Sequence, residues 1–164
     1  MRPDGSAIDP DQESAELAKN ALEYQALVSV AGSGLAAERL RMDVTAGNLA
    51  NAQTTQGANG QPYRRREVVL QEASGQSFGS LLARASSPVN GVQVAGIVED
   101  PSEPRRVYDP GHPDADAQGY VTLPNVNPVT EMVDLISASR SYEANVTAMQ
   151  TAKQLFSKTL ELLR

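Results

Sequence analysis

The sequence has no cysteine and no tryptophan, and its 164 residues include only two phenylalanines and one histidine. The absence of cysteine excludes disulfides and thiolate chemistry, and it leaves the redox compartment open. Large aromatic side chains supply much of the area buried in a core, so their scarcity predicts little globular core. The net charge of −6 does not provide the basic surface that neutralises phosphates, so no nucleic-acid partner is expected.

Long apolar runs are also missing. No stretch approaches the roughly 20 apolar residues that cross a bilayer. Residues 1–10 are polar and rich in turn formers, and we interpret them as a flexible leader without the apolar segment of a secretory signal peptide. If the chain leaves the cytoplasm, we expect an export route that reads no cleaved signal.

Two long apolar stripes are present, one near each end of the chain. Steps of three and four residues meet Met132, Leu135, Ser139, Tyr142, Val146, Met149, Lys153, Phe156, Leu160 and Leu163. The same steps meet Leu17, Ala21, Tyr24, Val28, Ala31, Leu35, Glu38, Met42, Thr45 and Leu49. A repeat of this length is typical of a helix that buries a narrow seam against another helix. We predict a mainly α protein whose terminal helices pair as an antiparallel coiled coil or bundle around a small β-rich insert.

The helix boundaries carry their own signals. Pro10 follows Asp9, which suits a capped first turn, so we predict an N-terminal helical segment over residues 11–56. Gly32 and Gly34 interrupt it, so either one long helix with a soft point or two helices meeting there would fit. The C-terminal helix is predicted over residues 125–164, with Asn127 as the cap and Pro128 at the first helical position.

The insert, residues 57–124, reads as short strands and turns. Strand-like runs occupy residues 63–70 and 92–98, and two shorter ones occupy residues 105–108 and 120–123. Residues 74–90, rich in Ser, Gly and Ala, are expected to form a loop or a weak helix. We interpret the run Arg64–Arg66 as a solvated strand edge or a donor of salt bridges.

Candidate chemistry is sparse. His112 has Asp109, Asp114 and Asp116 near it, but this spacing matches no usual metal site, and a proline-glycine turn explains these residues better. No nucleophile elbow and no phosphate-binding loop occurs, so we predict no catalytic residue, no metal and no cofactor. Asn48 and Asn51 lie near a helix end, where they could either satisfy local backbone groups or bond between subunits.

The two ends also echo each other. Sliding residues 8–28 onto residues 126–146 aligns the two helix starts and pairs Pro10 with Pro128, Glu13 with Glu131, Leu17 with Leu135, Tyr24 with Tyr142, Ala26 with Ala144 and Val28 with Val146. The matches fall on the cap and on the seam. The echo therefore indicates a shared packing role, and it favours common descent.

Several motifs resemble a known family. Residues 32–44 and 48–52 closely resemble the N-terminal signature of flagellar rod and hook proteins. Residues 107–121 and 125–145 narrow the resemblance to the family of proximal-rod protein C, which it covers from about residue 29 to the end. Residues 8–28 instead resemble the C-terminal helix of the sister rod protein B, so the chain looks like a fusion of the two.

The resemblance implies a structural subunit, not an enzyme, of the rod that crosses the periplasm and transmits torque from the membrane ring to the hook. It implies self-assembly, contacts with other rod proteins, the membrane ring and the flagellar type III export apparatus, and no small-molecule substrate. The expected assembly interface comprises Leu35, Met42, Asn48, Leu49, Asn51, Met132, Leu135, Tyr142, Val146, Met149, Phe156, Leu160 and Leu163. The alternatives are a coiled-coil adaptor or export-associated binding protein that does not polymerise and, far behind it, an enzyme built on the insert.

Overall fold

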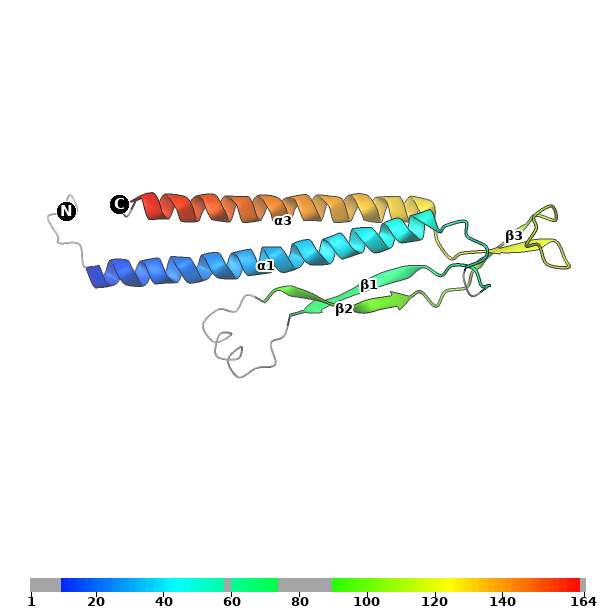
Figure 1. Cartoon of the computed structure of the whole chain (residues 1–164), viewed down its shortest axis with the longest axis horizontal. Helices are drawn as coiled ribbons and strands as arrows, with labels where there is room; N and C mark the ends of the chain where they lie inside the picture. The colour runs from blue at the N-terminus through cyan, green and yellow to red at the C-terminus, as the bar shows by residue number, and fades with distance from the viewer. Residues whose placement is uncertain (1–9, 58–59, 74–89, 163–164) are drawn as a thin grey trace.

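The computed structural model describes residues 10–57, 60–73 and 90–162. Two long helices, α1 (Pro10–Ala50) and α3 (Pro128–Leu162), lie side by side in opposite directions and set the long axis of the molecule (Figure 1). A pair of strands lies along α1, and a second pair projects past the end of the two helices (Figure 1). The predicted leader and the predicted loop lie outside the described residues, apart from Pro10 and Asn90 at their edges.

The N-terminal apolar stripe forms one helix of 41 residues, which decides between the two alternatives left open by Gly32 and Gly34. Gly34 lies against α3, where an added Cβ would come within 2.9 Å of Asn145 Nδ2. A glycine in a helix costs about 1 kcal/mol relative to alanine, but here it lets the second helix come close. The helix ends after Ala50, and the Asn51 N–H donates to Gly47 O at 3.1 Å.

The start of α3 follows the predicted capping arrangement. Pro128 is the first residue of the helix, and the Val129 N–H donates to Asn127 Oδ1 at 3.0 Å. The cap satisfies one of the backbone donors that a helix start leaves without an intrahelical partner. From there α3 continues for 35 residues without a break. This corresponds to about 50 Å at a rise of 1.5 Å per residue.

All four predicted strand runs are strands, paired as two separate antiparallel hairpins. Strands β1 (Arg66–Glu72) and β2 (Val92–Glu99) form the first hairpin, with a register shift between Val69 and Leu70. Strands β3 (Arg105–Tyr108) and β4 (Tyr120–Leu123) form the second. β1 begins later than predicted, because the Arg65 N–H donates to the Asn125 side chain instead of to a neighbouring strand.

The core is thin and consists largely of alanine. The buried apolar residues among those described are Ala31, Ala37, Ala52, Val121, Val126, Ala138 and Ala152. Large seam residues such as Tyr24 and Phe156, whose rings stack with centroids 4.5 Å apart, are only half-buried. Small side chains at the centre let the two helices approach closely, and the larger ones pack along the flanks of the contact.

The seam of α3 differs from the predicted apolar stripe at Met132. Leu135, Tyr142 and Phe156 are half-buried as expected, but Met132 is 46% exposed and Lys153 is exposed. The described residues of α3 that are buried are Glu131, Ala138 and Ala152, each one residue before a stripe position. Asn145 lies against Gly34 of α1. The prediction favoured large apolar residues, whereas the contact uses small side chains and polar ones that find partners on α1 and β1.

Candidate functional site: the polar junction and the helical faces

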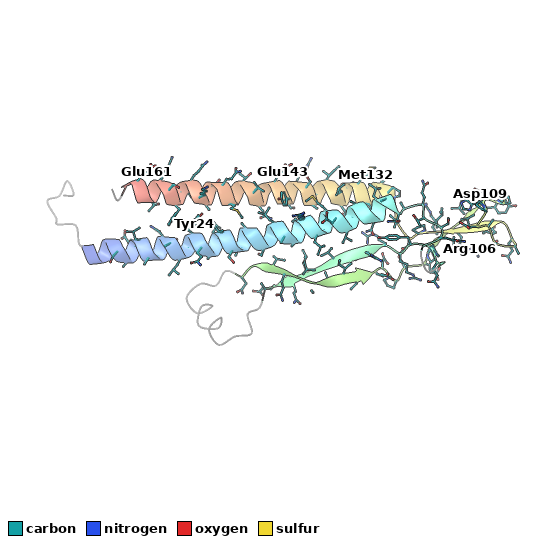
Figure 2. All side chains as sticks on the ribbon, viewed as in Figure 1. Tyr24, Arg106, Asp109, Met132, Glu143 and Glu161 are labelled. Atoms are coloured by element: carbon teal, nitrogen blue, oxygen red, sulfur yellow. The ribbon has the colours of Figure 1, made fainter. Side chains whose placement is uncertain are left out.

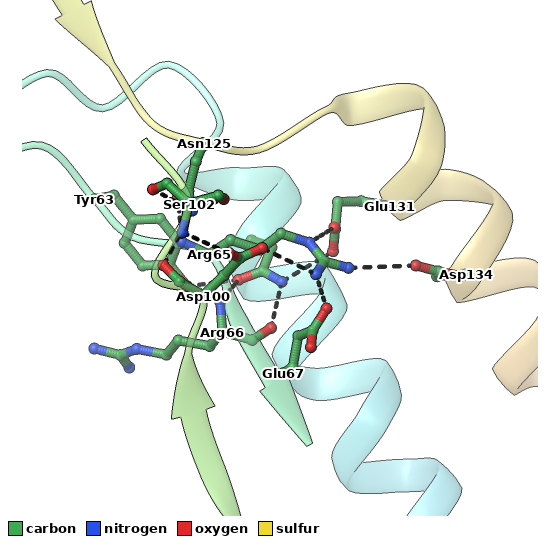
Figure 3. A network of polar contacts seen from close by, with 10 residues as sticks. Tyr63, Arg65, Arg66, Glu67, Asp100, Ser102, Asn125, Glu131 and Asp134 are labelled. Carbon is green, nitrogen blue, oxygen red and sulfur yellow. Dashed lines mark hydrogen bonds and ion pairs between the residues drawn. The ribbon is translucent and has the colours of Figure 1, made fainter. Parts of the chain in front are cut away.

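The end of α1, the start of β1 and the start of α3 meet in a group of polar residues that we call the polar junction: Asn48, Tyr63, Arg65, Arg66, Glu131 and Asp134 (Figure 3). The Asn48 side chain is 1% exposed, and both its amide nitrogen and its amide oxygen form hydrogen bonds. Its Nδ2 donates to Arg66 O at 2.8 Å and to Glu131 Oε2 at 2.9 Å. Its Oδ1 accepts from the Tyr63 hydroxyl and the Arg66 N–H, both at 2.9 Å. Asn48 therefore satisfies backbone and side-chain groups within the chain.

Arg65 supplies the cation that this buried cluster requires. Its Nε donates to Glu131 Oε1 at 2.5 Å, and the Glu131 side chain is 1% exposed. The guanidinium also reaches Asp134 at 3.6 Å and Asp100 at 3.7 Å, and it pairs with Glu67. A buried carboxylate without a partner costs several kcal/mol, so this arginine allows Glu131 to lie inside the junction. The interpretation of the arginine run as a salt-bridge donor is confirmed at Arg65.

Two ionisable groups of the polar junction are shifted from their ordinary behaviour. Burial by itself would lower the pKa of Arg65, but the hydrogen bond to Glu131 and the attraction of Glu131, Asp100 and Asp134 raise it overall. Burial raises the pKa of the Tyr63 hydroxyl. Arg65 therefore stays charged, and Tyr63 stays a neutral donor to Asn48, at all physiological pH values.

Asn125 extends the network toward the second hairpin. Its Oδ1 accepts from the Arg65 N–H at 2.9 Å, and its Nδ2 donates to Asp100 O at 3.2 Å and to Ser102 Oγ at 2.9 Å. Hydrogen bonds from the side chain and backbone of Ser102, followed by the charge of Arg65, lower the pKa of Asp100. The segments that enter and leave both hairpins are thereby tied to the ends of the helices.

A second contact fastens the other end of the first hairpin to α1. The Val92 N–H donates to Ser33 Oγ at 3.0 Å, and the Ser33 hydroxyl donates to Val30 O at 2.7 Å. Gly91 lies so close that an added Cβ would stand 2.5 Å from Ser33 Oγ. The hairpin is thus held against α1 at both ends, by the polar junction and by Ser33.

The residues around His112 form the turn that the sequence predicted. The Gly111 N–H donates to Asp109 Oδ1 at 3.2 Å, and the Asp114 N–H donates to His112 Nδ1 at 3.1 Å. Thr55 donates to Asp114 Oδ2 at 2.7 Å, which ties this turn to the segment after α1. Within the ranges that the structure describes, no three His, Cys, Asp or Glu side chains gather as a metal site.

The residues predicted for the assembly interface fall into four groups. Leu35, Met42, Leu49, Leu135, Tyr142, Val146, Met149 and Phe156 are half-buried. Met132, which is labelled in Figure 2, is 46% exposed on α3. Asn48 belongs to the polar junction, and Asn51 donates to Gly47 O at 2.9 Å. Leu160 lies in α3, whereas Leu163 is outside the described residues.

Sequence reasoning missed the central pair of the polar junction. In the sequence, Glu131 stands out only as the counterpart of Glu13 near the two helix starts. Its partner Arg65 is far away in the sequence, and nothing in either local pattern links the two. The one available signal was the arginine run beside a predicted strand, which indicated a salt bridge without naming its acceptor.

The chain is thus a pair of long antiparallel helices with two hairpins attached. Comparison with known protein families identifies the class of protein to which it belongs. Residues 29–58 match the family model described as "Flagella basal body rod protein". Residues 117–162 match the model described as "Flagellar basal body rod FlgEFG protein C-terminal". The two matches cover all of α3 and the part of α1 after residue 28. No helix within the described residues is long and apolar enough to cross a membrane.

Individual relatives narrow the class to one family. The chain is 50% identical over 143 residues to the flagellar basal-body rod protein FlgC of Bacillus subtilis, which covers 82% of this chain and 95% of the relative. It is 46% identical to that of Salmonella typhimurium and 42% identical to that of Borreliella burgdorferi, again over 95% of each relative. The chain belongs to the family of the flagellar basal-body rod protein FlgC. The expectation of a structural protein, not an enzyme, is confirmed by this family.

Proposed function

We propose that the chain is a structural subunit of the flagellar basal-body rod that polymerises helically through α1 and α3. The observation that carries the proposal is the apolar stripe on α3 that α1 does not cover. Val129 is 65% exposed, Met132 46%, Val133 61% and Ile136 54%. Spacings of three and four residues place them on one side of the helix. Monomeric proteins rarely leave contiguous apolar patches, so this side is suited to a neighbouring subunit.

The helical pair is proposed to act as an antiparallel coiled coil. In support, every position of the predicted stripe of α1 except Ala21 is half-buried or buried, among them Tyr24, Ala31, Leu35 and Thr45. The polar junction would then transmit load, because its hydrogen bonds and ion pairs join the end of the coiled coil to the hairpins. Torque between the membrane ring and the distal rod or hook requires such a joint.

Membership of the family supports further proposals about the assembly. We infer that the partners are further copies of this chain, other rod proteins, and components of the membrane ring and export apparatus. The location would be the rod that spans the periplasm, reached without a cleaved signal peptide. The chain would divide into a leader (1–10), an N-terminal helical segment (11–56), the outward-facing insert (57–124) and the C-terminal helix (125–164).

A charge on the exposed stripe separates assembly from folding. Met132→Asp places a carboxylate on the predicted interface at a position that is largely exposed in the single chain. We expect the purified variant to unfold within a few degrees of the unchanged protein, because the new charge stays in water. In the rod the charge would be buried against every neighbour, so a deletion strain that expresses the variant should be non-motile.

Gln150→Asp provides the matched control, because Gln150 is polar and exposed on the same helix. It should restore swimming in the deletion strain. Swimming cells that carry Met132→Asp, at normal protein levels, would show that this side of α3 is not an assembly interface. Rods that form normally in the deletion strain itself would overturn the structural role.

A further inference from the structure

The last part of α3 is paired with a part of α1 that lies outside the family match. Three contacts fix the alignment of the antiparallel helices: Asn48 with Glu131, Gly34 with Asn145, and Tyr24 with Phe156. Each step forward on one helix is a step back on the other, so residue 29, where the family match begins, lies opposite about residue 150. Residues 151–162 of α3 therefore lie opposite residues 17–28, which form the second part of residues 10–28. We call residues 10–28 the cover segment.

The cover segment extends the family's helix in this chain. The relatives align over 95% of their own length but over only 82–84% of this chain, so 16–18% of the chain is unmatched. That share corresponds to the 28 residues before the family match begins. α1 nevertheless passes through residue 29 as one continuous helix. This additional length carries α1 alongside the last three turns of α3.

The contacts of the cover segment are those of a packed helix. The ring of Tyr24 stacks on Phe156 with an interplanar angle of 15°, and Ala152 is only 4% exposed. Leu17 and Val28, on the same stripe as Tyr24, are half-buried. Stacked aromatic pairs contribute beyond their buried area, so the ring pair is the main anchor of the cover segment.

The covered face remains partly open. A groove of about 370 Å³ runs beside the ring pair, lined by Tyr24, Leu27, Leu155 and Phe156 with Asn20 and Thr159 at its rim. Leu27 is 46% exposed and Leu155 is 62% exposed. Another helix can pack on the part of an apolar face that remains open, or it can displace the helix that covers the rest.

We propose that the cover segment is an autoinhibitory contact that keeps residues 151–162 of α3 from packing against a helix of a second copy. A second copy fits because the cover segment repeats the cap and seam residues of the start of α3, as the pairs Leu17 with Leu135 and Tyr24 with Tyr142 illustrate. A face that accepts the cover segment therefore suits another helix of the chain's own design. The proposal deepens the assembly function, but its test uses purified protein and does not depend on motility.

Tyr24→Asp in the full chain tests the contact, because it replaces the stacked ring with a charge opposite Phe156. Sedimentation velocity over a concentration series should show self-association at a concentration at least about tenfold lower than for the unchanged protein. Gln25→Asp adds the same charge at the exposed neighbouring position, and it should leave the association unchanged. Circular dichroism of each variant would verify that the helical content is retained.

A double variant tests whether the uncovered face is the one that associates. Adding Phe156→Asp to Tyr24→Asp places a charge on that face, so the double variant should return to the association of the unchanged protein. Equal association of Tyr24→Asp and Gln25→Asp would overturn the proposal. Association of the double variant as strong as that of Tyr24→Asp would also overturn it, because another surface would then be responsible.

Discussion

Arg65 and Glu131 show how one ion pair joins distant parts of the chain. Glu131 belongs to the first turn of α3, whereas Arg65 precedes β1, and their contact at 2.5 Å links the helical pair to the insert. Asn48 completes the link from α1 by donating to Glu131 Oε2. Because Glu131 is almost fully buried, the strength of this joint depends on the cation.

Arg65→Met should therefore destabilise the protein strongly, because it leaves the buried Glu131 carboxylate without its cation. Loss of one partner of a buried pair typically costs about 3–5 kcal/mol, and we expect about 3 kcal/mol here since Arg65 is partly exposed. Urea unfolding followed by circular dichroism measures the change. Arg64→Met is the control, because Arg64 is exposed in the same run, and it should change stability by no more than about 0.5 kcal/mol.

A second substitution distinguishes the ion pair from simple packing. Glu131→Leu added to Arg65→Met removes the stranded charge, so much of the lost stability should return. A double variant no more stable than Arg65→Met would mean that the guanidinium acts through its other contacts, such as those to Asp134 and Asp100.

At the scale of elements, the first hairpin depends on α1 for its support. Two-stranded hairpins are marginal by themselves, and most side chains of β1 and β2 are exposed. The contact of Ser33 with Gly91 and Val92 holds the end of the hairpin far from the polar junction. Its geometry leaves no room for a side chain at residue 91.

Gly91→Ala should release this end of the hairpin. The new methyl group would stand 2.5 Å from Ser33 Oγ, so either the serine or β2 must move, and the bond from the Val92 N–H is lost. We expect a loss of about 1–2 kcal/mol and faster amide exchange at the start of β2. Gly96→Ala is the control, because a Cβ there would meet nothing within 4 Å. Equal exchange in both variants would contradict the role of Ser33.

The sequence predicts these elements better than it predicts their contacts. Caps and strands depend on local chemistry, so Asn127, Pro128 and the residues of β3 and β4 were placed correctly. The predicted stripe of α3 is wrong at Met132, because a local pattern favours the apolar Met132 over its buried neighbour Glu131. Only the distant partners Arg65 and Asn48 explain why Glu131 is inside, and no local pattern contains them.

At the scale of the whole molecule, stability depends on a long and thin contact. The two helices share a centre built largely from alanine. The first hairpin lies along α1, and the second projects past the end of both helices (Figure 1). A disturbance at one point of such a contact moves a whole helix, because an α-helix bends little over its length. We therefore expect the alanines at the centre to tolerate larger side chains poorly.

Ala138→Leu tests this expectation, because Ala138 is completely buried between the helices. Extra methylenes in a filled contact typically cost about 1–3 kcal/mol, and the helices can relieve the strain only by separating. Thermal unfolding should show a midpoint lower by several degrees. Ala148→Leu adds the same volume at an exposed position of α3, where it should leave the midpoint nearly unchanged. Equal midpoints for the two variants would show that the contact adapts to larger residues and that alanine does not set the helix separation.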